Sequence, residues 1–203
     1  MARRPTIAKL AALPLPPHVR DELARLVAEW APLGEQLAAA DADLGALAAA
    51  DPVVTRLRTM PTIGPITALA YVAALDDVTR FTDAHQVQGY LGLVPSEYSS
   101  GDRRVRGRIT KRGDVRLRWL LVEAGWRVVR APNAELRDLR TWGVKVADRR
   151  GKPIAAVALA RRLAAIRYAM WRDGTSYRAR QLESAASRPT PTRARTCRMI
   201  RDD

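Results

Sequence analysis

The sequence has few of the residues that mark secreted, zinc-binding or membrane proteins. Its one cysteine, Cys197, cannot form an internal disulfide and has no metal-ligating neighbour. The two histidines, His18 and His85, are isolated, so a zinc site is not expected. No run of 18 apolar residues occurs, which predicts no membrane-spanning segment. No apolar stretch follows residues 1–5, so no secretory signal is predicted either. These absences favour a cytoplasmic protein.

Lysine is also scarce, although the chain is strongly basic. Lys and Arg total 35 against 21 Asp and Glu, for a net charge of +14, and only four of the cations are lysines. Residues 1–100 are about neutral, whereas residues 101–130 carry ten cations against three anions. Arginine forms bidentate contacts to phosphate more readily than lysine does. The asymmetry predicts a scaffold half and a nucleic-acid-facing half, so DNA is the expected partner and the bacterial nucleoid the expected location.

A heptad pattern runs through residues 19–47. Apolar side chains recur there at alternating spacings of four and three, from Val19 to Leu47. About four heptads of this kind predict a coiled-coil helix over 19–50, preceded by an extension at 1–18. The helix either lies on its own domain or pairs with a second copy, which would make the protein a homo-oligomer. An interior proline costs roughly 3 kcal/mol in a helix, so Pro32 predicts a kink or break near Ala31.

The rest of the chain is predicted to be mainly α, with one domain over 53–175 and a disordered basic tail at 184–203. Helices are expected over 53–60, 66–75, 83–90, 115–130, 134–141 and 154–171. Gly92 is expected to cap the end of the helix over 83–90, and Asp114 the start of the helix over 115–130. Alternation of apolar residues and arginine over 105–109 predicts a short basic β-ribbon or arm. Arg161, Arg162 and Arg167 should extend from the last helix into solvent. The five tryptophans should pack on apolar helix faces.

The segment 60–65, Met-Pro-Thr-Ile-Gly-Pro, lies between two predicted helices and resembles a helix-hairpin-helix element. The backbone amides of such a hairpin meet a DNA phosphate without reading sequence. Thr62 stands where the first glycine of the hairpin is usual, which weakens this interpretation, and a purely structural hairpin is the alternative. Thr62 and Gly64 are therefore candidate DNA-binding residues.

Two adjacent serines, Ser99 and Ser100, directly precede the basic run. A hydroxyl beside several guanidiniums suits attack on a phosphodiester, because the cations offset the negative charge around phosphorus. The alternative is a turn entering a DNA-contacting loop with no chemistry. The cations that would contact DNA are Arg103, Arg104, Arg106, Arg108, Lys111, Arg112 and Arg116.

Five motifs in a fixed order resemble the C-terminal transposase domain of one insertion-sequence family. They are residues 60–65, 80–81, 90–95, 99–101 with 108–113, and 117–124. The family is that of the serine-using DEDD transposases, described as bridge-RNA-guided recombinases, with the Piv-like DNA invertases as relatives. The resemblance covers about residues 53–171, and residues 19–50 are similar in kind to the coiled-coil segment of the family.

This resemblance implies a transposase or site-specific recombinase module that binds DNA, with a structured guide RNA left open as a second partner. It implies that Ser100 or Ser99 becomes covalently linked to DNA, and Ser100 is favoured because it precedes Gly101. In the family an RNase-H-like domain with acidic residues binds Mg²⁺. Nothing in this chain resembles that domain, and Asp76 and Asp77 fit a solvated helix end better than a metal pair. We therefore expect no cofactor on this chain and no turnover by it alone.

Two other functions remain as alternatives. The chain could be a non-catalytic nucleic-acid-binding remnant of a transposase, or a regulator of one. A plain RNA-binding protein of ribosomal type is a third candidate, which the ordered motifs oppose.

Overall fold

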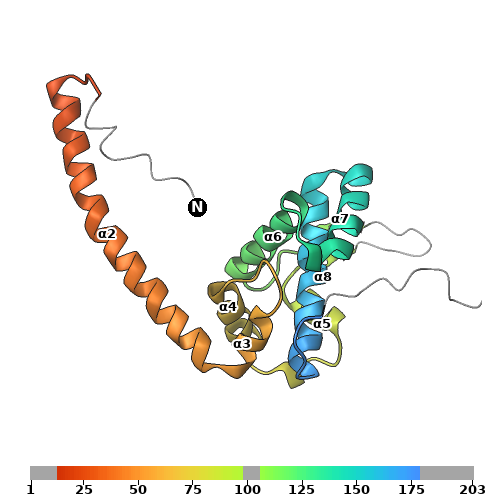
Figure 1. The fold of residues 1–203 in the computed structure, drawn as a ribbon. Helices are drawn as coiled ribbons and strands as arrows, with labels where there is room; N and C mark the ends of the chain where they lie inside the picture. The colour runs from red at the N-terminus through yellow and green to blue at the C-terminus, as the bar shows by residue number, and fades with distance from the viewer. Residues whose placement is uncertain (1–12, 98–105, 179–203) are drawn as a thin grey trace, which may run out of the picture.

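The computed structural model describes residues 13–97 and 106–178, and this part of the chain is mainly helical (Figure 1). The helices are α2 (Pro17–Ala50), α3 (Pro52–Arg58), α4 (Pro65–Leu75), α5 (Ala84–Tyr90), α6 (Val115–Arg130), α7 (Arg137–Arg150) and α8 (Lys152–Arg172). Two 3-10 turns, η1 (Val78–Arg80) and η2 (Ala134–Leu136), and two strands, β1 (Pro95–Glu97) and β2 (Arg106–Ile109), complete it. The predicted mainly α class and the short ribbon are confirmed. The predicted tail at 184–203 lies outside the described residues.

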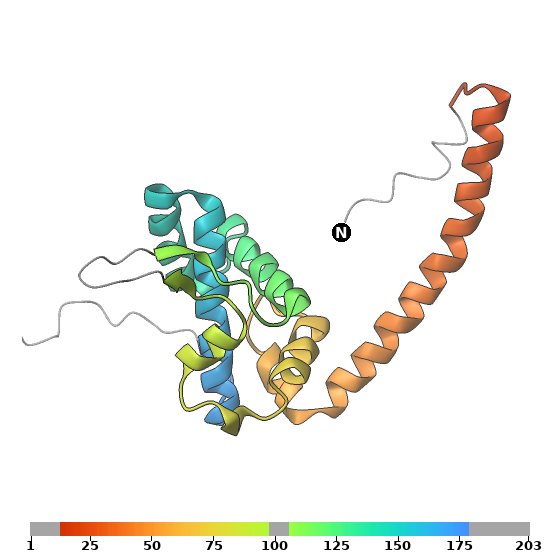
Figure 2. The ribbon, with the colours of Figure 1, turned by 180° about the vertical axis from the view of Figure 1, so that it is seen from behind.

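Helix α2 extends away from the other helices as a long arm (Figures 1 and 2). It continues through Pro32, so the predicted break is wrong, and the helix instead curves gently along its length (Figure 1). A proline removes one intrahelical hydrogen bond, and the long flanking segments keep the helix intact here. At its end the Asp51 carboxylate accepts hydrogen bonds from the amides of Val53 (2.7 Å) and Val54 (3.1 Å). This cap starts α3 directly after α2.

Helix α8 is the centre of the core, and α5, α6 and α7 pack around it. Small residues allow the closest approaches: a Cβ on Gly125 of α6 would lie 2.3 Å from the Ala156 carbonyl oxygen of α8. Two buried tyrosines tie distant segments to this helix. The Tyr71 hydroxyl donates to the Ala164 carbonyl at 2.8 Å, and the Tyr168 hydroxyl donates to the Phe81 carbonyl at 2.7 Å. The core is therefore fixed by polar contacts as well as by apolar burial.

Three expectations about side chains and lengths are corrected. Helix α7 runs to Arg150 and not to residue 141, because Leu139, Gly143 and Val146 continue its buried face. Arg167 does not reach solvent: it is fully buried, with its guanidinium carbon 5.4 Å from the centre of the Tyr71 ring. Trp30 and Trp119 are not core residues, since 63% and 60% of their surfaces are exposed.

No helix in the described part of the chain is both long and apolar enough to cross a lipid bilayer.

Candidate nucleic-acid interface

The two strands form an antiparallel ribbon whose free end lies toward the serine segment. Pro95 pairs with Ile109 and Glu97 with Arg106. The Ser96 hydroxyl donates to the Arg108 carbonyl at 3.0 Å, and a Cβ on Gly107 would lie 2.5 Å from the Ser96 hydroxyl oxygen. The strands thus place Glu97 beside Arg106, and these described residues flank the segment 98–105. Ser99, Ser100, Arg103 and Arg104 lie in that segment, outside the described residues, as does the side chain of Arg106.

The base of the ribbon is held by two interlocked glycine turns. Gly92 ends α5 with a φ of +67°, and a Cβ there would lie 1.9 Å from the Arg112 carbonyl oxygen. Gly113, with a φ of +91°, faces it: a Cβ there would lie 2.0 Å from the Tyr90 carbonyl oxygen. Only glycine tolerates both the left-handed backbone and these approaches. The Lys111 amide also donates to the Gly92 carbonyl at 3.1 Å.

The buried side chain of Arg118 links the two glycine turns by hydrogen bonds. Its guanidinium donates to the carbonyls of Leu91 (3.1 Å) and Arg112 (3.2 Å), and only 8% of the residue is exposed. The sequence analysis did not single it out. Its sequence position was a signal that could have found it. Arg118 directly follows Leu117 and precedes Leu121 by about one helical turn, so it lies on the buried side of α6.

The candidate cations at the base of the ribbon all reach solvent. Arg108, Lys111, Arg112 and Arg116 are exposed. Lys111 has a φ of +57°, a left-handed backbone conformation. The hydrogen bond from its amide to the Gly92 carbonyl holds it in place. Asp114 caps α6 by accepting from the Leu117 amide, as predicted. The base therefore presents four positive side chains on a backbone fixed by hydrogen bonds.

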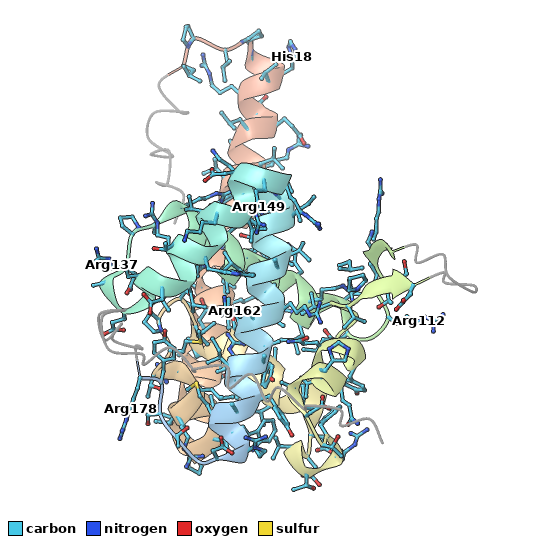
Figure 3. The ribbon with its side chains drawn as sticks, turned by 90° about the vertical axis from the view of Figure 1, so that its right-hand side faces the viewer. His18, Arg112, Arg137, Arg149, Arg162 and Arg178 are labelled. Atoms are coloured by element: carbon cyan, nitrogen blue, oxygen red, sulfur yellow. The ribbon has the colours of Figure 1, made fainter. Side chains whose placement is uncertain are left out.

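The α3–α4 turn lies apart from the ribbon. The ribbon and the α3–α4 hairpin lie on opposite sides of α8 (Figures 2 and 3). Thr62 has a φ of +73°, so it takes the left-handed conformation of the glycine that it replaces. Its hydroxyl oxygen is buried without a hydrogen-bond partner among the described residues. Gly64 begins α4 with an extended backbone. The turn has the shape of a helical hairpin, and its contact with DNA stays a prediction.

A second cationic feature was missed by the sequence analysis. A shallow cleft at the start of α7 is lined by Pro132, Asn133, Ala134, Arg137, Arg140 and Thr141. Figure 3 shows Arg137 on the opposite side of α8 from Arg112. Exposed cations therefore lie on both sides of α8.

The acidic residues of the described part of the chain do not gather into a metal site. No group of three His, Cys, Asp or Glu side chains that could hold an ion is found among the described residues. Asp77 instead accepts hydrogen bonds from the Thr79 hydroxyl (2.7 Å) and amide (2.8 Å), which lower the pKa of its carboxyl. Both carboxylate oxygens of Asp77 are thus engaged in the η1 turn.

Comparison with known proteins shows that part of this chain is similar to one family. Residues 54–140 match the IS116/IS110/IS902 transposase family. The match includes the α3–α4 turn, both glycine turns, the ribbon and α6. It also supports the family resemblance drawn from the sequence motifs.

Three curated relatives extend the similarity along most of the chain. The "Probable family 20 transposase" of Pseudomonas aeruginosa is 35% identical over 179 residues, covering 88% of this chain and 53% of the relative. The transposase for insertion sequence element IS1111A of Coxiella burnetii is 32% identical, covering 86% and 48%. The transposase for IS1328 of Yersinia enterocolitica is 32% identical, covering 84% and 52%. The chain spans about half the length of these relatives.

Proposed function

We propose that this chain is the DNA-binding, serine-bearing module of an insertion-sequence transposase. The observation that carries the proposal is the base of the ribbon. Gly92, Gly113 and Arg118 fix its backbone, while four cations reach solvent on β2, on the turn that follows it and on the first turn of α6. The names of the three relatives, all transposases and two of them of insertion sequence elements, support the transposase part of this proposal.

In this proposal the cations hold the DNA backbone and the serine reacts with it. Lys111 and Arg112 contact phosphates at the ribbon base, and Arg103, Arg104 and Arg106 offset the charge of the phosphate under attack. The oxygen of Ser100, or of Ser99, forms a bond to phosphorus while the bond from phosphorus to a sugar oxygen breaks. The serine proton passes through a base to the leaving sugar oxygen.

We also propose that α2 pairs with a second copy of the chain. Its apolar seam is exposed at Leu26 (56%), Trp30 (63%), Leu33 (62%) and Leu37 (64%). Seams of this heptad spacing are covered by a partner helix in coiled coils. The proposed module is therefore a homodimer with two ribbons. A structured guide RNA stays a proposal of the same kind, to be tested by adding RNA to the assay below.

Covalent trapping separates catalysis from binding. The chain is incubated with Mg²⁺ and suicide DNA substrates, with and without the remaining half of a relative such as the Coxiella protein, and run on a denaturing gel. We expect a shifted protein–DNA band that Ser100→Ala or Ser99→Ala abolishes. If no lane shows a band while salt-sensitive binding persists, the chain is a non-catalytic nucleic-acid-binding module.

A further inference from the structure

Trp119 presents an indole ring to solvent beside the cations of the ribbon base. It lies on α6, three residues after the exposed Arg116 and four after Val115, which is 71% exposed. Residues three and four apart are neighbours on a helix surface. Trp119 therefore shares one surface with Val115 and Arg116, directly after the turn that carries Lys111 and Arg112.

Three other tryptophans, unlike Trp119, have an arginine or an aromatic ring as a neighbour. The guanidinium carbon of Arg130 lies 4.6 Å from the centre of the Trp126 ring. The guanidinium carbon of Arg162 lies 4.5 Å from the centre of the Trp142 ring. Trp171 packs against Tyr71 with ring centres 6.4 Å apart. Within the described residues Trp119 has no ring or cation contact of this kind, and 60% of it is exposed. Core packing does not explain an indole at this position, because α6 buries Leu117, Leu121 and Val128.

We propose that Trp119 stacks on an unpaired nucleobase of the bound DNA. This rests on the proposed function and adds the state of DNA that the module prefers, a duplex with locally unpaired bases. Aromatic side chains stack on any base because every base has a π face. Cations beside the ring hold the phosphates that flank that base.

The charge of the surface favours DNA over a second copy of the chain as the occupant. A copy with a net charge of +14 would bring more positive charge to a surface that already carries Lys111, Arg112 and Arg116. A polyanion is attracted by the same cations. The indole and the cations therefore both favour DNA as the partner at this surface.

Two DNA probes of the same length test this. One is a fully paired duplex and the other carries a short central bubble of unpaired thymines. Their affinities for the full chain are compared between wild type, Trp119→Ala and Trp119→Phe. Ile154→Ala is the control, because Ile154 is also an exposed apolar side chain (51%) but lies on α8, away from the ribbon base and the α2 seam.

We expect Trp119→Ala to weaken bubble binding by about 5- to 100-fold and duplex binding little. Trp119→Phe should retain most of the bubble preference, and Ile154→Ala all of it. Equal losses on both probes, or no loss on the bubble, would overturn the stacking role. So would a change in sedimentation caused by Trp119→Ala alone, which would make the surface a self-association site. If wild type binds neither probe, the proposed function fails first.

Discussion

Arg118 donates a hydrogen bond of 3.1 Å to the carbonyl of Leu91, joining α6 to the end of α5 across 27 residues of sequence. The same guanidinium reaches the Arg112 carbonyl, so one buried side chain fastens the turn that carries two of the proposed phosphate contacts. Hydrogen bonds from a charged donor to buried carbonyls are among the stronger ones.

Arg118→Met should therefore loosen the ribbon base and weaken DNA binding. One buried and one partly buried carbonyl lose their charged donor, which costs about 2–4 kcal/mol of unfolding free energy, measured by urea denaturation. Arg116→Met is the matched control on the same helix turn. Because Arg116 is exposed, its loss should change the unfolding free energy by less than about 0.5 kcal/mol while still lowering DNA affinity. Equal stability of the two variants would show that Arg118 does not fasten the turn.

Gly92→Ala tests the interlocked turns. The added Cβ would lie 1.9 Å from the Arg112 carbonyl oxygen on a left-handed backbone, so we expect a loss of more than about 4 kcal/mol or failure to fold. Gly89→Ala, three residues earlier in α5, meets nothing within 4 Å. It should leave thermal stability unchanged or raise it slightly, because alanine favours the helix. A Gly92→Ala protein that melts like Gly89→Ala would exclude the interlock.

Leu37→Asp should dissociate the proposed dimer. Leu37 is 64% exposed on the seam of α2, and a carboxylate there would be desolvated by a partner helix. We expect sedimentation equilibrium to show a dimer for wild type and a monomer for the variant. Ala42→Asp, exposed on the same helix but off the seam, should remain dimeric. A monomeric wild type at all concentrations tested would reject the pairing.

Arg167→Met should stabilise the protein at neutral pH. The guanidinium is fully buried, its three nitrogens have no hydrogen-bond partner among the described residues, and burial lowers its pKa to about 10. Because the folded pKa lies below the usual value, the charged form penalises folding fully below pH 10. That penalty fades as pH rises through 10 toward the usual pKa of arginine. Removing the charge should raise the unfolding free energy by about 1–3 kcal/mol.

The control for this prediction is Arg162→Met, also on α8. Arg162 is exposed and lies over Trp142, so its loss should have a small destabilising effect. If Arg167→Met destabilises more than Arg162→Met, the buried guanidinium contributes to folding through contacts other than those seen here.

Local patterns in the sequence predicted much of the fold. Apolar periodicity located α4, α6 and α8, and Asp114 was recognised as the cap of α6 because caps depend on neighbouring residues alone. Gly92 was recognised as the end of α5 for the same reason. The close approach of Gly92 to the Arg112 carbonyl was not recognised, since a contact between turns 20 residues apart depends on tertiary packing.

Burial of charged and aromatic side chains was predicted least well. Arg167 and Arg118 lie on helices whose neighbours cover them, and arginine is seldom expected inside. Trp119 was expected inside and lies outside. In each case exposure depends on whether a distant part of the chain covers the side chain, which the helical period of its own segment does not reveal. The candidate site was predicted as a set of cations, and its fixed backbone was seen only in the structure.

The most direct test of the central claim is the salt dependence of duplex binding at the ribbon base. A Lys111→Ala/Arg112→Ala double variant is compared with Arg149→Ala/Arg150→Ala, which removes the same charge from the exposed end of α7. Each phosphate contact contributes about one unit to the slope of log affinity against log salt. The account predicts that the first variant lowers the slope by about two and the second leaves it nearly unchanged. Equal effects of both variants, or binding that does not depend on salt, would contradict it.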